Sequence, residues 1–196
     1  KTKKENEMKA VISDRIYLDV LPHQKKKIDD ELTYSIPSFR YDDPPLVIKN
    51  MGTIREDLVT IPSGRTDLIP LDHDIKDKRI TKPVEFPPFK FELRPSQQSV
   101  YEEIHDSSII NAWVSWGKTF TGLAIAGKLG QKTLVITHTL SLRKQWEEEV
   151  NKVFGFQPGI VGSGKFDIST PVVVGNIQTL YRKVPEIRRE FGTIIL

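Results

Sequence analysis

The stretch Ala112-Trp113-Val114-Ser115-Trp116-Gly117-Lys118-Thr119 has the residue types and spacing to bind a phosphate group. It fits the pattern G-x-x-x-x-G-K-[ST], in which backbone N–H groups surround a phosphate at the positive end of a helix. Lys118 would reach the β- and γ-phosphates of a nucleotide, and the Thr119 hydroxyl would ligate Mg²⁺. Gly117 would let the backbone approach closely. The pattern predicts ATP and Mg²⁺ as cofactors, although Ala112 stands where its first glycine is expected.

A second stretch, residues 159–165, also spells G-x-x-x-x-G-K. Here the position for the magnesium ligand is Phe166, which has no hydroxyl. The residues that follow include Pro171 and cannot open a helix. We therefore interpret this stretch as a glycine-rich connection between strands of a sheet, and we keep residues 112–119 as the phosphate loop.

Other kinds of catalytic or metal site find no support in the sequence. The chain has no cysteine, and its four histidines show no i, i+4 pair, so nothing indicates a zinc site. No G-x-S-x-G stretch is present to supply a nucleophile.

Composition is that of a soluble globular protein. Of 196 residues, 38% are hydrophobic and 28% charged, and the formal net charge is only +3. No apolar run approaches the ~20 residues that cross a bilayer, so we expect no membrane partner and a cytoplasmic location. Residues 1–88 hold 16 basic and 16 acidic side chains. Any contact with nucleic acid must therefore come from placed groups rather than from bulk charge.

The elements that position the phosphate loop are inferred from hydrophobic patterning. Helices are expected at residues 96–104, 119–129 and 140–154, with a further helix starting at 177. Continuous apolar stretches predict strands at 109–114, 133–137, 172–174 and 193–196. Strands of this kind that alternate with helices predict an α/β fold with a parallel sheet covered on both faces.

The chain is expected to form two domains. Residues 1–7 are predicted to be a disordered leader, and residues 8–71 a small, β-rich α+β accessory domain with one helix. Residues 72–88 are densely charged and interrupted by Pro83, Pro87 and Pro88, which predicts a linker. Residues 89–196 carry the α/β pattern and the phosphate loop.

Four segments in order resemble the motifs of superfamily 2 helicases. They are Phe91-Glu92-Leu93-Arg94-Pro95-Ser96-Gln97-Gln98, residues 112–119, Val135-Ile136-Thr137-His138-Thr139-Leu140-Ser141-Leu142-Arg143-Lys144-Gln145-Trp146, and Val173-Val174-Gly175-Asn176-Ile177-Gln178-Thr179-Leu180. Within that superfamily the chain is most similar to tailed-phage DNA helicases of the UvsW and XPB types. The resemblance implies that residues 89–196 are the first RecA-like lobe of a P-loop NTPase.

The resemblance also implies roles for individual residues. Gln97 would hydrogen-bond the adenine edge, with Arg94 near the base or its ribose. The remaining contacts to ATP would come from Ser115, Trp116, Gly117, Lys118, Thr119 and Phe120, of which Lys118 and Thr119 would be catalytic. The nucleic-acid backbone would be contacted by Thr139, Arg143, Gln178 and Thr179.

Each of these residues also has a simpler structural interpretation. Gln97 could face solvent on its helix, and Trp113 and Trp116 could be core aromatics. Arg143 precedes Glu147 by one helical turn, so it could belong to a solvated, internally paired face. Gln178 and Thr179 could only support the start of a helix.

The function implied by the resemblance is that of an ATP-dependent helicase or translocase. It would unwind or remodel branched DNA in phage replication, recombination or repair, in the cytoplasm of an infected host. DNA is the expected partner, as a single strand or branched duplex, with RNA as the alternative. The sequence ends before the family's DExH motif and second lobe, so this chain alone is expected to bind ATP but hydrolyse it poorly.

Two alternatives remain open at this point. One is another P-loop ATPase, such as a kinase, which would need neither the Gln97 element nor the Gln178-Thr179 element. The other is a non-catalytic nucleic-acid-binding module in which the loop, changed at Ala112, is degenerate.

Overall fold

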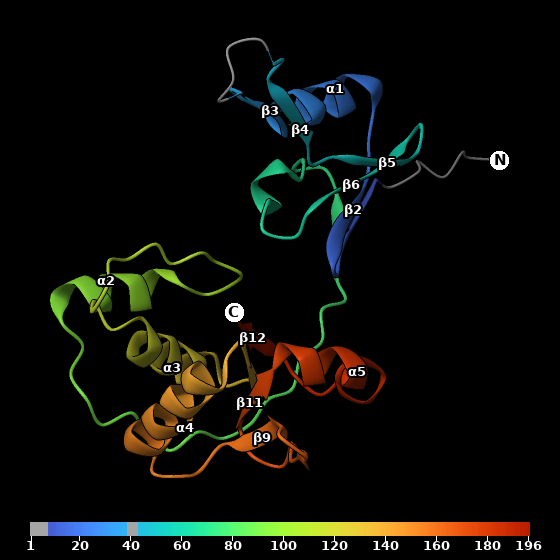
Figure 1. Cartoon of the computed structure of the whole chain (residues 1–196). Helices are drawn as coiled ribbons and strands as arrows, with labels where there is room; N and C mark the ends of the chain where they lie inside the picture. Colours follow the sequence, from blue (N-terminus) through green and yellow to red (C-terminus); the bar gives the residue numbers. More distant parts are fainter. Residues whose placement is uncertain (1–7, 39–42) are drawn as a thin grey trace. The chain divides into compact units, whose positions relative to one another are not determined.

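The chain divides into two compact units, residues 1–79 and residues 80–196, in a computed structural model that describes residues 8–38 and 43–196 (Figure 1). The predicted leader, residues 1–7, lies outside the described residues. The predicted linker, residues 72–88, is divided between the two units. Among the described residues, no helix combines the length and apolar character needed to cross a membrane.

The first unit is a small α+β domain. Its elements are β1 (Lys9–Ile12), β2 (Arg15–Asp19), α1 (Pro22–Glu31), β3 (Thr33–Ile36), β4 (Leu46–Lys49), β5 (Gly52–Arg55), β6 (Leu58–Pro62), the 3-10 helix η1 (Thr66–Leu68) and β7 (Asp74–Asp77). Five strands form a sheet in the order β5-β6-β2-β1-β7, and β3 and β4 pair separately as a hairpin. Burial alternates along strand β2, as expected for a strand with one face on the core. Ile16 and Leu18 are fully buried and belong to the same core cluster as Ile28 of α1.

Strand β7 lies within the predicted linker, residues 72–88, and belongs to the sheet of the first unit. The linker prediction is therefore wrong for these residues. Residues 74–77 pair in parallel with β1, with Asp74 opposite Lys9 and Asp77 opposite Ile12. All four residues of β7 are exposed, and three of them are charged. Charged side chains are common on strands at the edge of a sheet, so a charged run does not exclude a strand there.

The second unit is an α/β domain. Its elements are α2 (Pro95–Glu103), α3 (Lys118–Leu129), β8 (Thr133–Thr137), α4 (Leu140–Phe154), β9 (Gly159–Gly162), β10 (Lys165–Phe166), β11 (Val172–Asn176), α5 (Ile177–Ile187) and β12 (Thr193–Ile195). The sheet order is β10-β9-β11-β8-β12. Strands β9, β11, β8 and β12 are parallel, and only β10 is antiparallel to its neighbour.

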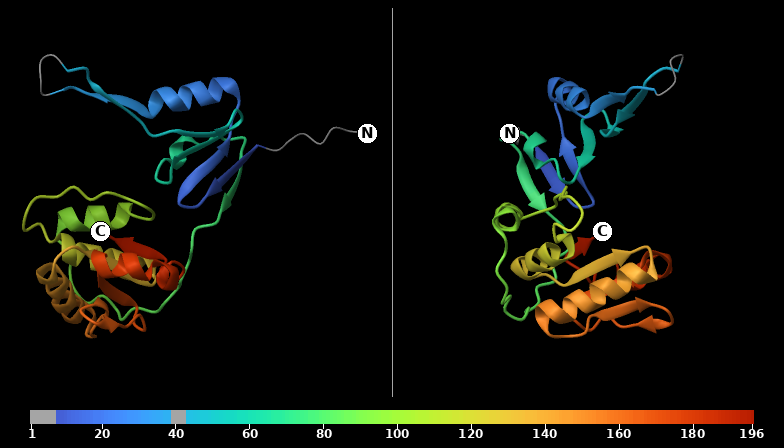
Figure 2. Two further views of the ribbon diagram at one scale, coloured as in Figure 1. Left: turned by 45° about the vertical axis from the view of Figure 1, so that its right-hand side comes forward. Right: turned by 60° about the vertical axis from the view of Figure 1, so that its left-hand side comes forward.

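Helices cover both faces of this sheet, as predicted (Figure 2). Leu123 of α3 and Val150 of α4 pack with Val135 and Val174 on one face. Leu180 of α5 packs on the opposite face with residues that alternate with these along the strands, among them Leu134 and Val173. The continuous apolar runs arise because each strand is buried on both sides.

Residues 80–91 pack against the second unit and are not a linker. Val84 donates its backbone N–H to the Gly130 carbonyl at 3.0 Å. The rings of Phe86 and Phe154 lie 5.2 Å apart, and those of Phe89 and Phe120 lie 5.3 Å apart. The prolines in this segment prevent a helix or a central strand, but they leave its aromatic side chains free to fill the core.

The predicted strand at 109–114 is wrong. The described structure has no strand between α2 and α3, and Ile109 and Val114 are 96% and 85% exposed. An apolar, β-branched run forms a strand only when a partner strand accepts its hydrogen bonds. Residues 159–165, predicted as a connection, instead contain strand β9 and the turn that leads into β10.

Candidate nucleotide-binding site

Three helices begin at the carboxyl edge of the parallel sheet. Helix α4 starts three residues after the end of β8, and α5 follows β11 directly. Helix α3 ends just before β8 begins, so its amino end lies at this same edge. The first-turn amides of a helix have no partner within the helix, and they carry its positive dipole end. Anionic ligands of open α/β sheets bind at such an edge.

The phosphate loop enters α3 through left-handed backbone. Gly117, at the N-cap of α3, has φ +95°, and Ser115 has φ +65°. The exposed side chain of Lys118 crosses the loop, and its Nζ donates to the carbonyl oxygens of Ala112 at 2.9 Å and Trp113 at 3.0 Å. Ala112 thus takes part in the loop through its backbone, and its methyl group does not prevent the loop from closing.

Helix α2 is anchored to the phosphate loop through Trp116. Gln97 is 3% exposed, and its Nε2 donates to the Trp116 carbonyl oxygen at 2.9 Å. Its Oε1 accepts from the Arg94 backbone N–H at 3.0 Å, and the Arg94 guanidinium donates to the same Trp116 carbonyl. The solvent-facing interpretation of Gln97 is therefore wrong. The amide oxygen and the amide nitrogen of Gln97 both form hydrogen bonds with protein groups in this structure. The predicted contact of Gln97 with adenine therefore stays a prediction.

The two tryptophans of the loop differ in environment. Trp116 is 3% exposed, and its indole N–H donates to the hydroxyl of Ser96 at 3.2 Å. Trp113 is 68% exposed, and its ring lies 6.5 Å from that of Trp116 at 76°. Core packing therefore describes Trp116, whereas Trp113 remains open to solvent. The role of Ser96 was missed because no local pattern marks a hydrogen bond across 20 residues.

The residues of the first turn of α3 have side chains of the kinds that bind a nucleoside triphosphate and its magnesium ion. Lys118 offers an exposed ammonium group, and Thr119 follows with a hydroxyl of the kind that Mg²⁺ binds. The predicted ligand Phe120 directs its ring into an aromatic cluster, 5.3 Å from Phe89 and 5.6 Å from Phe91. Phe120 can therefore contact a phosphate only through its backbone N–H.

Three of the predicted nucleic-acid contacts lie at the same edge of the sheet. Thr139 caps α4, and its Oγ1 accepts from the backbone N–H of Leu142 at 3.2 Å. Gln178, on the first turn of α5, donates to the His138 carbonyl at 3.4 Å, which joins the loops after β8 and β11. Thr179 follows on the same turn and is half-buried.

Arg143, the fourth predicted contact, is 9% exposed. Its Nε donates to Glu147 at 2.8 Å, as the i, i+4 spacing suggested. Its Nη1 donates to Ser163 at 2.9 Å and to the side-chain oxygen of Asn176 at 3.0 Å. The paired interpretation is correct and the solvated one is not. No sequence pattern pointed to Ser163 or Asn176.

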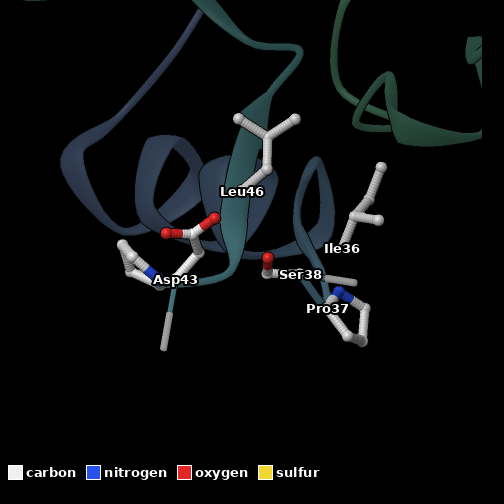
Figure 3. A pocket seen from close by; sticks show the side chains of 6 residues that line it. Ile36, Pro37, Ser38, Asp43 and Leu46 are labelled. Atoms are coloured by element: carbon white, nitrogen blue, oxygen red, sulfur yellow. The ribbon is translucent and has the colours of Figure 1, made fainter. Parts of the chain in front are cut away.

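A pocket in the first unit has few side chains that could bind a charged ligand or take part in a reaction. It is lined by Ile36, Pro37, Ser38, Asp43, Pro44 and Leu46 (Figure 3). Among the described residues that line it, Asp43 is the one ionisable side chain. The described residues of the chain contain no cluster of His, Asp or Glu that could hold a metal ion. The phosphate loop is therefore the candidate site.

Comparison with known proteins agrees with this site. A sequence model of the family described as "Type III restriction enzyme, res subunit" matches residues 90–196. The chain is 41% identical over 201 residues to "Probable helicase D10" of Escherichia phage T5, which covers 96% of this chain and 43% of that protein. It is 33% identical over 79 residues to "DNA 3'-5' translocase XPB2" of Sulfurisphaera tokodaii, covering 40% of this chain and 18% of that protein.

The chain thus spans less than half the length of these relatives. The family match covers the α/β unit that carries the phosphate loop and both neighbouring loops at the carboxyl edge, and its fold is RecA-like. With its phosphate loop on a parallel sheet and its long match to a phage protein, the chain belongs to the type III restriction enzyme res-subunit family, among the phage-type superfamily 2 helicases.

Proposed function

We propose that this chain is the nucleotide-binding part of an ATP-dependent DNA helicase or translocase. The observation that carries the proposal is the position of Lys118 and Thr119 at the carboxyl edge of the sheet, the same edge as the loops that hold Thr139 and Gln178. A nucleotide and a nucleic-acid strand bound at one edge can be coupled by small movements of the loops between them. The printed names of both relatives, a helicase and a DNA translocase, support the same interpretation.

In this proposal the phosphates of ATP bind at the amino end of α3. Lys118 would exchange its two loop carbonyls for the β- and γ-phosphates, and the backbone N–H groups of residues 117–120 would donate to phosphate oxygens. Thr119 would hold Mg²⁺, whose contribution when bound is to offset phosphate charge. Arg94 and Gln97 would fix the loop through Trp116 and contact the base from the same side.

The nucleic acid would bind along the carboxyl edge through its backbone. Hydroxyl, amide and N–H groups of the kind found there hold phosphates without reading sequence. We propose DNA as the substrate, unwound or remodelled at branches during phage replication, recombination or repair inside the infected host. The first unit would help engage duplex or junction DNA.

The test is a titration of the chain with Mg²⁺ and ADP, followed by tryptophan fluorescence. Trp113 and Trp116 flank the loop, so saturable binding should change their emission. Lys118→Ala should weaken binding by roughly tenfold to a hundredfold, since a hydrogen bond to a charged group contributes about 1.5–3 kcal/mol. Lys152→Ala, on the last turn of α4, removes a charge away from the loop and should leave the affinity unchanged.

A second measurement, the binding of labelled DNA and RNA oligonucleotides, completes the test. Equal ADP affinity in the wild type and Lys118→Ala would refute the phosphate loop. Nucleotide binding without any binding of single-stranded or forked DNA or RNA would favour a different P-loop ATPase. Oligonucleotide binding without nucleotide binding would favour a non-catalytic module, and tighter binding of RNA than of DNA would replace the proposed substrate.

A further inference from the structure

Lys128, on the last turn of α3, is bonded to the carboxyl end of α2. Its Nζ donates to the backbone carbonyl oxygens of Tyr101, of Glu102 at 3.1 Å and of Ile104 at 3.0 Å. The same ammonium group lies over the ring of Tyr101, 4.9 Å from the centroid. Three carbonyls match the three N–H donors of an ammonium group, and within residues 8–38 and 43–196 no carboxylate pairs with Lys128.

The end of a helix is a favourable place for such a cation. The last carbonyl oxygens of a helix have no partner within it, and they carry its negative dipole end. Tyr101 and Glu102 belong to the last turn of α2, and Ile104 is its C-cap. Hydrogen bonds from a charged donor contribute more to stability than those between neutral groups. Lys128 therefore fixes the carboxyl end of α2 to α3.

Helix α2 has few apolar contacts that could hold it in place. Of its nine residues, Gln97 alone is buried, and it is polar. Val100 and Tyr101 are half-buried, and the other six residues are exposed. A helix shorter than about 12 residues is only marginally stable by itself. The position of α2 therefore depends on the polar groups that bind its ends.

The amino end of α2 is bonded to the phosphate loop. Arg94 and Gln97 donate to the Trp116 carbonyl, and Ser96 accepts from the Trp116 indole. Trp116 lies just before the start of α3, whereas Lys128 lies in its last turn. Helix α2 thus runs alongside α3, start beside start and end beside end (Figure 1). Release of the carboxyl end would leave α2 free to pivot about Trp116.

We propose that Lys128 is a positioning residue for the nucleotide base, because it holds α2 in the orientation from which Arg94 and Gln97 meet the base. This inference rests on the proposed function. The phosphates bind elsewhere, at the amino end of α3, a helix that Leu123 anchors in the core of the second unit. Lys128 should therefore act on the base and leave the phosphates unaffected.

The test compares Mg²⁺–ADP with Mg²⁺–pyrophosphate by titration calorimetry. Pyrophosphate occupies the phosphate loop alone, whereas ADP also occupies the base site. Lys128→Met keeps the length of the side chain and removes all three donors. It should weaken ADP binding by about fivefold to tenfold and pyrophosphate binding by less than about twofold, because the bonds to Trp116 remain and keep the loop closed.

Two further variants separate positioning from general effects of charge and stability. Lys128→Arg keeps a cation with several N–H donors and should retain most of the ADP affinity. Lys152→Met removes an exposed ammonium group on α4 and should change neither affinity. Circular dichroism should show that Lys128→Met is folded, since Nζ of Lys128 contacts α2 and its C-cap and not the core of the sheet.

A selective loss of ADP affinity in Lys128→Met, largely restored in Lys128→Arg, would support the inference. Equal losses for ADP and pyrophosphate would overturn it, because Lys128 would then act through the phosphate loop. Unchanged ADP affinity would overturn it as well, and so would an unfolded Lys128→Met. Each of these results leaves the proposed function intact if the wild type binds ADP. A wild-type chain that binds neither ligand would overturn both.

Discussion

At Gly117 two separate features of the structure favour glycine over other residues. The backbone has φ +95°, and a Cβ would lie 2.7 Å from Nε2 of Gln97. Gly155, which ends α4 with φ +77°, shares the first feature, but a Cβ there would meet no neighbouring atom within 4 Å. Both alanine variants should lose about 1 kcal/mol of stability. Only Gly117→Ala should also lower the affinity for Mg²⁺ and ADP, measured by calorimetry. Equal ADP affinities would show that the contact with Gln97 has no effect on the loop.

At the scale of single residues, some contacts of the candidate site could be predicted from the sequence and others could not. The phosphate loop was predictable because its glycine, lysine and threonine are adjacent in the chain and each has a distinct chemical task. The partners of Arg143 were not, because Ser163 and Asn176 lie 20 and 33 residues away and meet it only when β9 and β11 pair. One of the three hydrogen bonds of Arg143, the i, i+4 contact with Glu147, was predictable from the sequence.

Among the elements, the segment before α2 gives a direct test of its packing. Phe86 is half-buried against Phe154, so Phe86→Ala should destabilise the second unit by about 1–3 kcal/mol, less than a fully buried phenylalanine. Lys90→Ala, at an exposed position nearby, should have little effect. Urea unfolding followed by circular dichroism would measure both. A Phe86→Ala variant as stable as Lys90→Ala would restore the linker interpretation of this segment.

Element boundaries were predictable where capping residues define them. Helix α4 was expected at residues 140–154 and begins and ends there, since Thr139 caps its first turn and Gly155 ends it in left-handed backbone. Strand β7 and the absence of a strand at 109–114 were not predictable, because both depend on whether a neighbouring strand is present.

At the scale of the whole molecule, the boundary between Arg79 and Ile80 predicts where the chain can be shortened without loss of the second unit. A chain that starts at Ile80 should bind Mg²⁺ and ADP as tightly as the full chain, because it keeps the bond from Val84 to Gly130 and the ring contacts of Phe86 and Phe89. A chain that starts at residue 89 should unfold at a lower temperature. Calorimetric scans of both chains would measure the difference, and equal transitions would place the boundary near Pro88 instead.

The role proposed for the first unit can be tested with the same boundary. Deleting residues 8–79 from the full-length protein should reduce strand separation on forked DNA while leaving nucleotide affinity unchanged. Equal strand separation by the full-length and the deleted protein would refute a role of this unit in engaging DNA.

Acid should destabilise the chain only at low pH. Hydrogen bonds hold four carboxyl pKa values below their usual range: Asp14 through Ser13, Asp67 through Arg65, Asp77 through Arg79, and Asp167 through the backbone of Ser169. A lowered folded-state pKa stabilises the protein above the unfolded value of about 3.9, and this contribution is lost as pH falls through the folded value. The unfolding temperature should therefore be insensitive to these groups from about pH 5 to pH 8 and fall below about pH 4. Asp67→Asn should show a weaker decline in acid, and an equal decline would exclude the pair with Arg65 as a contributor.

The order of strands in the second sheet has a consequence for synthesis on the ribosome. Strand β8 pairs with β11 and β12, both of which follow it in the chain, with α4, β9 and β10 in between. Until β11 has left the ribosome, β8 has two open hydrogen-bonding edges, and Leu134 stays uncovered until α5 has followed. Parallel pairing across so long a stretch is slow to form. The nascent chain should therefore depend on chaperones most strongly after β8 has emerged from the ribosome and before β11 has emerged. Synonymous codons that lengthen this interval should raise the fraction that aggregates.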